Sequence, residues 1–386
     1  MTGGRYRRAA SRLLKGGIAR LSPARMERPL WVFGGASGRS YSDNASVVHA
    51  AATDRLPPES TVWVIDASSP DRDLAVRQGP IADRDSLRAH RLTQAAHAIF
   101  FSHGTQDVPG MQWNTEALTV RLGHGVTAFG RADDKDRRSL ARMVAAVDLA
   151  PVASRMEQDH KMAWGFARHQ LPVTGLPRWD AMLQARRTRT PGADERPLVL
   201  YVPTSRPWHT AADASPDGAL APMREFLDSP AVAEWTSRGE FDLAVHLHQN
   251  TRYRFGAFDW LPPQVRLLDA EADLPETIAQ ASLVISDYSS ILWDALYLDT
   301  PVAFFQFDRE AHLHHRGSFI DLHARLFGPT AIRADALLEI LRDALDDGFA
   351  QGDWRADRER WQARAFAHRD DRNTERVLSA VEERLG

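Results

Sequence analysis

Cysteine is absent from this chain of 386 residues. Its absence excludes a disulfide framework, a thiolate zinc site, an iron–sulfur cluster and a cysteine nucleophile. Long hydrophobic runs are also missing, since no continuous apolar segment approaches the ~18 residues that span a bilayer. The N-terminus lacks the apolar core of a signal peptide. The sequence therefore predicts a cytoplasmic protein.

Charge is unevenly distributed along the chain, although the formal net charge is only −3. The first 28 residues carry eight Arg or Lys against one acid, so the remainder is acidic. Leu13, Leu14, Ile18 and Leu21 recur among these charges at helical spacing. We expect either an amphipathic helix on an anionic membrane, peripheral at its inner face, or a disordered basic leader without a specific partner. The acidic body carries no nucleic-acid recognition module, so no nucleic-acid partner is predicted.

Short apolar runs alternate with helix-like stretches from Pro29 onward, which is typical of parallel sheets covered by helices. The predicted strands are 30–33, 61–66, 98–101, 118–122, 198–202, 241–247, 283–286 and 302–305. We predict an α/β protein of GT-B architecture, with two Rossmann-like domains facing a central cleft. The expected parts are a leader at 1–28, domains at 29–185 and 197–350 joined by a polar, Arg-rich linker, and a helical tail at 351–386.

The motif Ser286-Asp287-Tyr288-Ser289-Ser290 lies between an apolar strand and an apolar-faced helix. Hydroxyl groups and free N–H groups at a helix N-terminus suit a phosphate group, because the helix end has unpaired donors and a partial positive charge. The same Ser and Asp side chains are also compatible with simple helix capping. Asp294 follows one helical turn after Ser290 and faces the same side.

Histidines gather where predicted strands end. His246 and His248 alternate along an extended strand, where they suit a metal ion or, without metal, a phosphate or a leaving group. No carboxylate pattern completes a standard metal site near them, so no metal is predicted. His103-Gly104 and His124-Gly125 follow two other strands, and ligands bind at the carboxyl edge of open α/β sheets.

Several motifs, in their order along the chain, resemble the CDP-glycerol glycerophosphotransferases of teichoic-acid and capsule polymer synthesis. They are the turn at His124, Gly175-Leu176-Pro177-Arg178-Trp179-Asp180, Tyr201-Val202-Pro203-Thr204-Ser205-Arg206, His248, the Ser286 to Ser290 motif with Asp294, and Phe307-Asp308 with Arg316-Gly317. The resemblance implies a GT-B fold with an N-terminal acceptor domain and a C-terminal donor domain. It also implies transfer of an alditol phosphate, typically glycerol phosphate, from a CDP-activated donor to a hydroxyl of a lipid-linked or polymeric acceptor.

The resemblance further implies roles for single residues. His124 would be the general base for the acceptor hydroxyl, and His248 would contact the donor diphosphate and stabilise the departing CMP. The donor-binding residues would be Ser286, Asp287, Ser289, Ser290, Asp294, Arg316, Arg178 and Thr204. No cofactor is expected beyond the CDP-alditol co-substrate, since phosphoryl-type transfer depends mainly on positioning and charge neutralisation.

The chain departs from the family pattern around both histidines. The usual Trp-His-Gly-Thr-Pro-Leu-Lys turn is here Gly123 to Phe129, without Trp or Lys, and Arg-x-His-Pro has become His246-Leu247-His248-Gln249. His103-Gly104-Thr105 is a second His-Gly turn, but its distance from the Pro-Arg-x-Asp motif favours His124 as the base. Two alternatives stay open: a GT-B glycosyltransferase that uses a nucleotide sugar, and a non-catalytic homologue that binds a nucleotide or polymer.

Overall fold

The computed structural model describes residues 28–131, 137–190, 192, 195–208, 218, 220–247, 251–252, 260–269 and 272–386. The chain divides into two compact units. Unit 1 comprises Met1–His124, Lys135–Ala181 and Asp370–Gly386, and unit 2 comprises Gly125–Asp134 and Met182–Arg369. The basic leader lies outside the described residues except for Arg28, so both expectations for it stay predictions.

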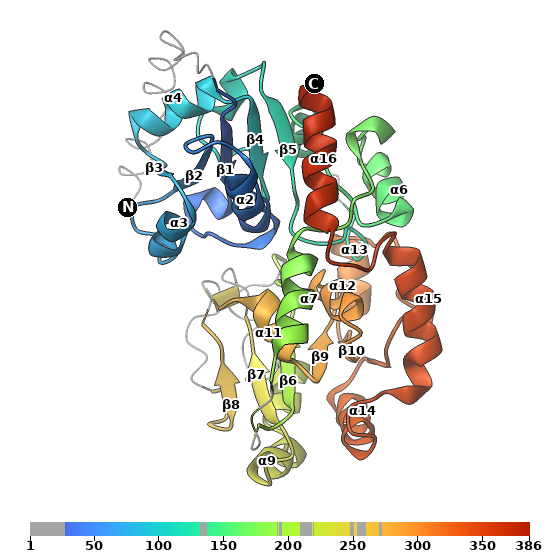
Figure 1. The fold of residues 1–386 in the computed structure, drawn as a ribbon. Helices are drawn as coiled ribbons and strands as arrows, with labels where there is room; N and C mark the ends of the chain where they lie inside the picture. The colour runs from blue at the N-terminus through green and yellow to red at the C-terminus, as the bar shows by residue number, and fades with distance from the viewer. Residues whose placement is uncertain are drawn as a thin grey trace. The chain divides into compact units, whose positions relative to one another are not determined.

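Unit 1 contains a parallel sheet of five strands in the order β3-β2-β1-β4-β5 (Figure 1). The strands are β1 (Trp31–Gly34), β2 (Thr61–Ile65), β3 (Ile81–Asp83), β4 (Ala98–Phe101) and β5 (Leu118–Arg121). In the central strand, Val32 pairs with Val62 of β2 on one side and with Ile99 of β4 on the other. Strands covered on both faces are hydrophobic at nearly every position, which is the pattern of β1, β2 and β4.

Helices cover both faces of this sheet. Trp31 and Phe33 pack on one face, in a core shared with α2 and α16, whereas Val32 belongs to the core on the opposite face. α2 and α16 also contact one another. The helices of unit 1 are α2 (Asp43–Arg55), α3 (Arg72–Gln78), α4 (Leu87–Ala95), α5 (Arg137–Ala145), α6 (Arg155–Ala163), the beginning of α7 (Arg178–Thr188) and α16 (Asn373–Leu385).

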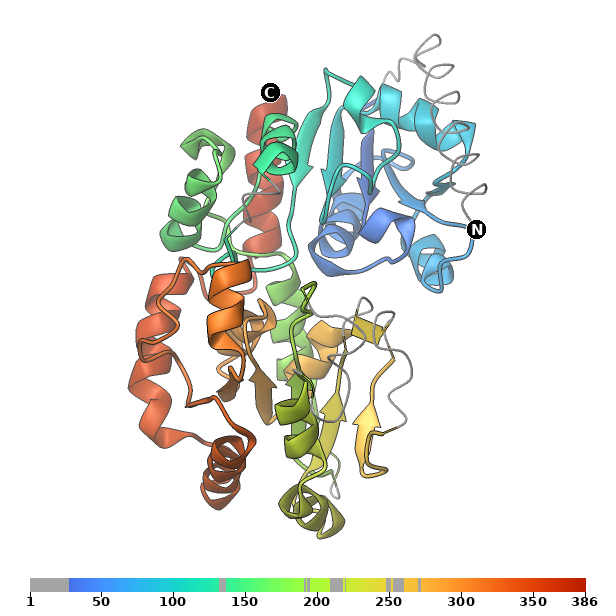
Figure 2. The ribbon, with the colours of Figure 1, turned by 180° about the vertical axis from the view of Figure 1, so that it is seen from behind.

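Unit 2 contains a six-stranded parallel sheet in the order β11-β10-β9-β6-β7-β8. Its strands are β6 (Leu198–Val202), β7 (Asp242–Val245), β8 (Val265–Leu267), β9 (Leu283–Ser286), β10 (Val302–Phe305) and β11 (Thr330–Ala331). Residues of α8 (Ala221–Leu227), α9 (Pro230–Ser237) and α14 (Ala334–Asp346) share one core with β6, and α8 lies in front of this sheet in Figure 2. α11 (Leu274–Gln280) and α12 (Ile291–Tyr297) contact the strands, α15 (Arg355–Ala365) packs on α12, and α13 (Arg309–His315) follows β10.

The eight strands expected from apolar runs are all present, within two residues of their predicted ends. The sequence reasoning missed β3, β8 and β11, which have two or three residues each and lie at sheet edges. The two parallel α/β units and the structural comparison reported below confirm the predicted fold class. The start of α2 was placed wrongly, near Ala45 with Asp43 and Asn44 as caps. The helix begins at Asp43 after Ser42, and the Asn44 side chain bonds elsewhere.

The C-terminal segment returns to unit 1 through α16. Asp180 caps this helix, because its carboxylate accepts the backbone N–H groups of Asn373 at 3.0 Å and Thr374 at 2.7 Å. The terminal carboxyl-side helix is therefore integrated into the first core instead of standing apart as a tail. Within the described ranges, no helix is both long and apolar enough to cross a membrane.

Candidate active site

The sheet of unit 1 has its switch point between β1 and β4, from which later strands are added outward on either side. Ligands of α/β proteins bind at the carboxyl ends of the strands beside such a point. The turn that follows β1 contains Ala36, Ser37 and Gly38, whose φ angles are 45°, 59° and 83°. Left-handed backbone at two non-glycine residues costs free energy and persists only where the surroundings hold it.

Asp107 holds this turn next to the one that follows β4. Its buried carboxylate accepts the N–H of Ser37 at 2.7 Å through Oδ1, and the N–H groups of His103 at 2.8 Å and Gly104 at 3.3 Å through Oδ2. A Cβ at Gly34 would lie 2.6 Å from the carbonyl oxygen of Asp107, so this close approach requires glycine. One carboxylate thus joins the ends of β1 and β4.

The two predicted His-Gly turns bring His103 and His124 together. Their rings stack with centroids 4.9 Å apart and planes 8° from parallel, and both side chains reach solvent. Nδ1 of His103 accepts the N–H of Ala36 at 3.3 Å, which places the proton of the neutral ring on Nε2. His103 therefore has a defined tautomer and supports one face of the candidate base.

Arg178 and Asn44 hold the backbone of the His124 turn. The Arg178 guanidinium donates to the carbonyl oxygen of His124 at 2.9 Å and to Asp43 Oδ1 at 2.9 Å. The Asn44 side chain donates to the carbonyl oxygen of Gly123 at 3.1 Å and accepts the N–H of Arg178 at 3.0 Å. Arg178, which the sequence reasoning grouped with the donor-binding residues, is placed by the structure at the turn of the candidate base.

The surroundings of His124 favour its neutral form. Loss of hydration in the dense surroundings of the ring, one part of which stays open to solvent, is the main cause that lowers the pKa of His124 to about 4. Neighbouring His103 acts in the same direction, as do Arg121 and Arg178, whereas Asp43 opposes them. An imidazole that is neutral at pH 7 can accept a proton from a hydroxyl group.

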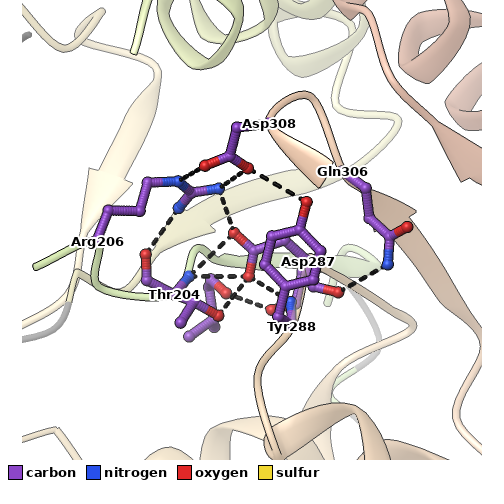
Figure 3. A network of polar contacts seen from close by, with 8 residues as sticks. Thr204, Arg206, Asp287, Tyr288, Gln306 and Asp308 are labelled. Carbon is purple, nitrogen blue, oxygen red and sulfur yellow. Dashed lines mark hydrogen bonds and ion pairs between the residues drawn. The ribbon is translucent and has the colours of Figure 1, made fainter. Parts of the chain in front are cut away.

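The motifs of unit 2 meet at its own switch point, between β6 and β9. Asp287 follows β9, and its buried carboxylate accepts the N–H and hydroxyl of Thr204 at 3.0 Å and 2.5 Å and the N–H of Tyr288 at 2.6 Å. Arg206 donates to Asp287 at 2.7 Å and to both oxygens of Asp308 at 2.6 Å and 2.9 Å, as Figure 3 shows. Loops after β6, β9 and β10 are thereby tied into one network.

Arg206 is charged within this network although it is buried. Burial by itself would lower the pKa of Arg206, but Asp287 and Asp308 outweigh burial and raise the pKa above its ordinary value. Tyr288 completes the group, since its hydroxyl donates to Asp308 at 3.2 Å and its ring stacks on His312 at 3.7 Å. Buried charges are tolerated in proteins where pairing and hydrogen bonds are complete.

The predicted donor-binding residues divide into two groups by burial. Ser286, Asp287 and Asp294 are buried, and the Ser286 hydroxyl donates to the carbonyl oxygen of Val202 at 2.5 Å. Asp287 and Thr204 bond to one another, as described above. These side chains shape the turn, and their placement supports an indirect contribution to ligand binding.

Ser289, Ser290 and Arg316 form the second group. Both serines are half-buried at the start of α12, and Ser290 makes no side-chain capping bond there, so the alternative of pure helix capping finds no support at this residue. Arg316 is exposed at the end of α13, and Gly317 after it has a φ of 61°. These side chains are the ones of the set that remain open for contact with a ligand.

His248 lies outside the described residues, so its predicted role is not tested. His246 follows β7, and its backbone N–H donates to the carbonyl oxygen of Tyr201 at 3.0 Å. No group of three His, Asp or Glu residues suited to a metal ion occurs in the described part of the chain. The metal alternative for His246 and His248 therefore stays open.

Comparison with known proteins identifies the family. The profile of CDP-glycerol:poly(glycerophosphate) glycerophosphotransferases matches residues 19–383. The chain belongs to this family. Among curated proteins it is similar to a teichoic acid glycerol-phosphate primase of Bacillus spizizenii, with 27% identity over 60% of this chain and 59% of the relative. It is also similar to the minor teichoic acid biosynthesis protein GgaB of Bacillus subtilis, with 18% identity over 92% of this chain and 40% of GgaB.

Solved structures give the same fold for this glycerophosphotransferase family member. The wall teichoic acid polymerase TagF matches with a TM-score of 0.75 and 16% identity, covering 100% of this chain and 98% of that one. A UDP-GlcNAc 2-epimerase of Methanocaldococcus jannaschii, solved with UDP-GlcNAc and UDP, matches with a TM-score of 0.56 and 11% identity over 92% of this chain and 99% of that one. Because the chain spans 59% and 40% of the two curated relatives, their full activities come to it only as proposals.

Several residues of this family member escaped the sequence reasoning as contributors to the site. Asp107 and Asn44 are single polar residues outside any quoted motif, and only the fold brings them to the turns that they hold. Arg206 and Asp308 were quoted within motifs, but without a role. A buried cation that reads as a loop residue in sequence gives no signal of its partners, which come from strands distant along the chain.

Proposed function

We propose that this chain transfers an alditol phosphate, glycerol phosphate first among them, from a CDP-activated donor to a hydroxyl of a teichoic-acid or capsule polymer or its lipid-linked primer, with release of CMP. Family membership supports the reaction class. The observation that carries the proposal is the neutral His124 imidazole at the carboxyl end of β5, in a turn held by Arg178 and Asn44.

In the proposed reaction the acceptor oxygen attacks the phosphorus atom that bears the alditol. A new P–O bond forms, the P–O bond to CMP breaks with its electron pair leaving on CMP, and the hydroxyl proton passes to His124. General-base catalysis of this kind contributes typically ~10²–10⁴ to the rate. For His248 we propose contact with the donor diphosphate and stabilisation of the departing CMP, on the family pattern alone.

On the donor side we propose that Ser289, Ser290 and Arg316 contact the diphosphate. Their exposure supports this, and a guanidinium group binds phosphate oxygens with two parallel hydrogen bonds. Ser286, Asp287, Asp294 and Thr204 are proposed to shape the turn that presents these groups. For Arg178 we propose a positioning role at His124 in place of a donor contact.

The proposed reaction uses the CDP-alditol as co-substrate and takes no metal or other cofactor. Addition of EDTA should therefore leave the rate of CMP release within about twofold, and a larger loss that Mg²⁺ restores would contradict this part. We further propose that the enzyme acts at the cytoplasmic side of the membrane, with the basic leader contacting anionic lipid. No nucleic-acid partner is proposed.

The test measures CMP release from CDP-glycerol in the presence of a lipid-linked acceptor, with CDP-ribitol and a UDP-sugar in parallel reactions. We expect CMP release that depends on acceptor, and incorporation of labelled glycerol phosphate into the product. Turnover of the UDP-sugar without CMP release would favour a GT-B glycosyltransferase. Binding without turnover of any donor would favour the non-catalytic homologue.

A further inference from the structure

Arg121, the last residue of β5, lies three positions before His124. Its backbone N–H donates to the carbonyl oxygen of Leu149 at 2.8 Å, which fixes the strand end. The side chain is half-buried, and its Nε–H is buried without a hydrogen-bond partner. Nor does its guanidinium form an ion pair or hydrogen bond with any residue that the structure describes. An unpaired guanidinium in such surroundings is costly to the fold.

The carboxylates whose charges act on Arg121 already accept other donors. Glu157 lies 3.2 Å from the Lys161 ammonium and accepts the N–H of Ala153 at 2.8 Å. Asp107 accepts three backbone N–H groups of the turns after β1 and β4. Burial lowers the pKa of Arg121, and these two carboxylates oppose this through space without bonding to it. The guanidinium donors thus stay available to an outside anion.

The position that carries a lysine in the usual family turn supplies no cation here. Phe129 occupies it, and its ring is buried against Trp293 with centroids 5.1 Å apart. Among the cations of unit 1 that influence His124, Arg178 is bound to Asp43 and to the His124 carbonyl oxygen, whereas Arg121 has donors to spare. Arg121 is therefore the cation beside the candidate base that a substrate anion can occupy.

We propose that Arg121 binds a phosphate group of the acceptor, next to the acceptor hydroxyl that His124 deprotonates. This inference rests on the proposed function and specifies its acceptor: a chain or primer that ends in a phosphate-bearing unit is preferred over a neutral alcohol. The planar guanidinium pairs two N–H donors with two phosphate oxygens, and this pairing supplies the partner that the fold withholds. The phosphate also orients the terminal hydroxyl toward the imidazole.

The first experiment measures binding alone, with sn-glycerol 3-phosphate as the probe in an NMR titration of the full chain. Arg121→Gln should weaken binding by about tenfold or more, since hydrogen bonds to charged groups contribute strongly, and Arg121→Lys should restore part of it. Arg91→Gln, which removes an exposed charge on α4, is the matched control and should bind as the wild type does. Equal binding by wild type and Arg121→Gln would overturn the proposal.

Two further measurements separate the alternatives. Titration with CDP-glycerol locates the phosphate: if Arg121→Gln loses affinity for CDP-glycerol and not for glycerol 3-phosphate, Arg121 contacts the donor and the acceptor assignment is wrong. Thermal unfolding tests a purely structural role: Arg121→Gln should keep or raise the melting temperature, and a clear decrease together with unchanged probe binding would sink the proposal.

Activity measurements then connect the site to the reaction. For Arg121→Gln, kcat/KM should fall at least about tenfold more with a phosphate-terminated acceptor than with a neutral glycerol-bearing acceptor. An equal fall for both acceptors would contradict the assignment. If wild type releases no CMP from CDP-glycerol but binds glycerol 3-phosphate through Arg121, the proposed function fails while the anion site stands.

Discussion

Replacement of Arg206 by methionine removes the cation that two buried carboxylates share. The guanidinium donates to Asp287 at 2.7 Å and to Asp308 at 2.6 Å and 2.9 Å, and it is 4% exposed, so water cannot take its place. Breaking a buried ion pair by removing one partner costs about 3–5 kcal/mol, because the remaining charges stay buried and uncompensated. For a unit of this size each kcal/mol lowers the melting temperature by ~2–4 °C. We expect a decrease of roughly 6–20 °C.

Differential scanning calorimetry of the full chain measures this decrease in the transition of unit 2. The control is Arg238→Met, which removes an arginine of unit 2 that is 63% exposed and paired with Glu234. An exposed pair contributes ~0–1 kcal/mol, so the control should shift the transition little. If Arg206→Met were no more destabilising than Arg238→Met, the reasoning from burial and pairing would be refuted.

A triple variant tests the physical cause. Adding Asp287→Asn and Asp308→Asn to Arg206→Met removes the uncompensated charges, so part of the lost stability should return. A further loss in the triple variant would show that geometry and hydrogen bonding, instead of buried charge, dominate the network. The double variant Asp287→Asn with Asp308→Asn, which retains the cation, completes the cycle.

Three other outcomes follow from the site. His124→Ala should lower kcat by ~10²–10⁴ while CDP-glycerol affinity stays within about twofold, and turnover within tenfold of wild type would contradict the base assignment. Because its surroundings lower the pKa of His124, the acidic limb of kcat/KM against pH should lie below the ordinary histidine range, and His103→Asn should move it upward by removing a group that depresses this pKa. An unmoved limb in that variant would exclude the stack as a cause. Deletion of residues 1–28 should weaken binding to anionic vesicles in a co-sedimentation assay and leave CDP-glycerol affinity unchanged; undiminished vesicle binding would dismiss the leader as a membrane contact.

The sequence was informative where apolar runs and motifs are local. Continuous hydrophobic runs such as 198–202 and 302–305 predict central strands because such strands are buried on both faces. The short edge strand Thr330–Ala331 has too few residues to create a pattern. Its existence depends on pairing with β10, which is information that its own residues do not contain.

The site shows the same division between local and distant information. The histidine turns after β4 and β5 could be placed at a sheet edge from strand order alone, and the structure brings their rings into contact. The function of Arg178 could not, since its partners Asp43 and the His124 carbonyl oxygen are more than 50 residues away along the chain. Motif membership says that a residue is used in the family, and only its contacts say for what.

The cap that Asp180 forms on α16 has a consequence for synthesis. Val377, Leu378 and Val381 fill the core against Trp31 and Phe33, so the first sheet stays uncovered on that face until the end of α16 has left the ribosome. Nearly all of unit 2 is contiguous, at Met182–Arg369, and can close earlier. The part of the protein made first is thus the last to be completed, and during that interval its aromatic strand face is the surface that a chaperone would meet.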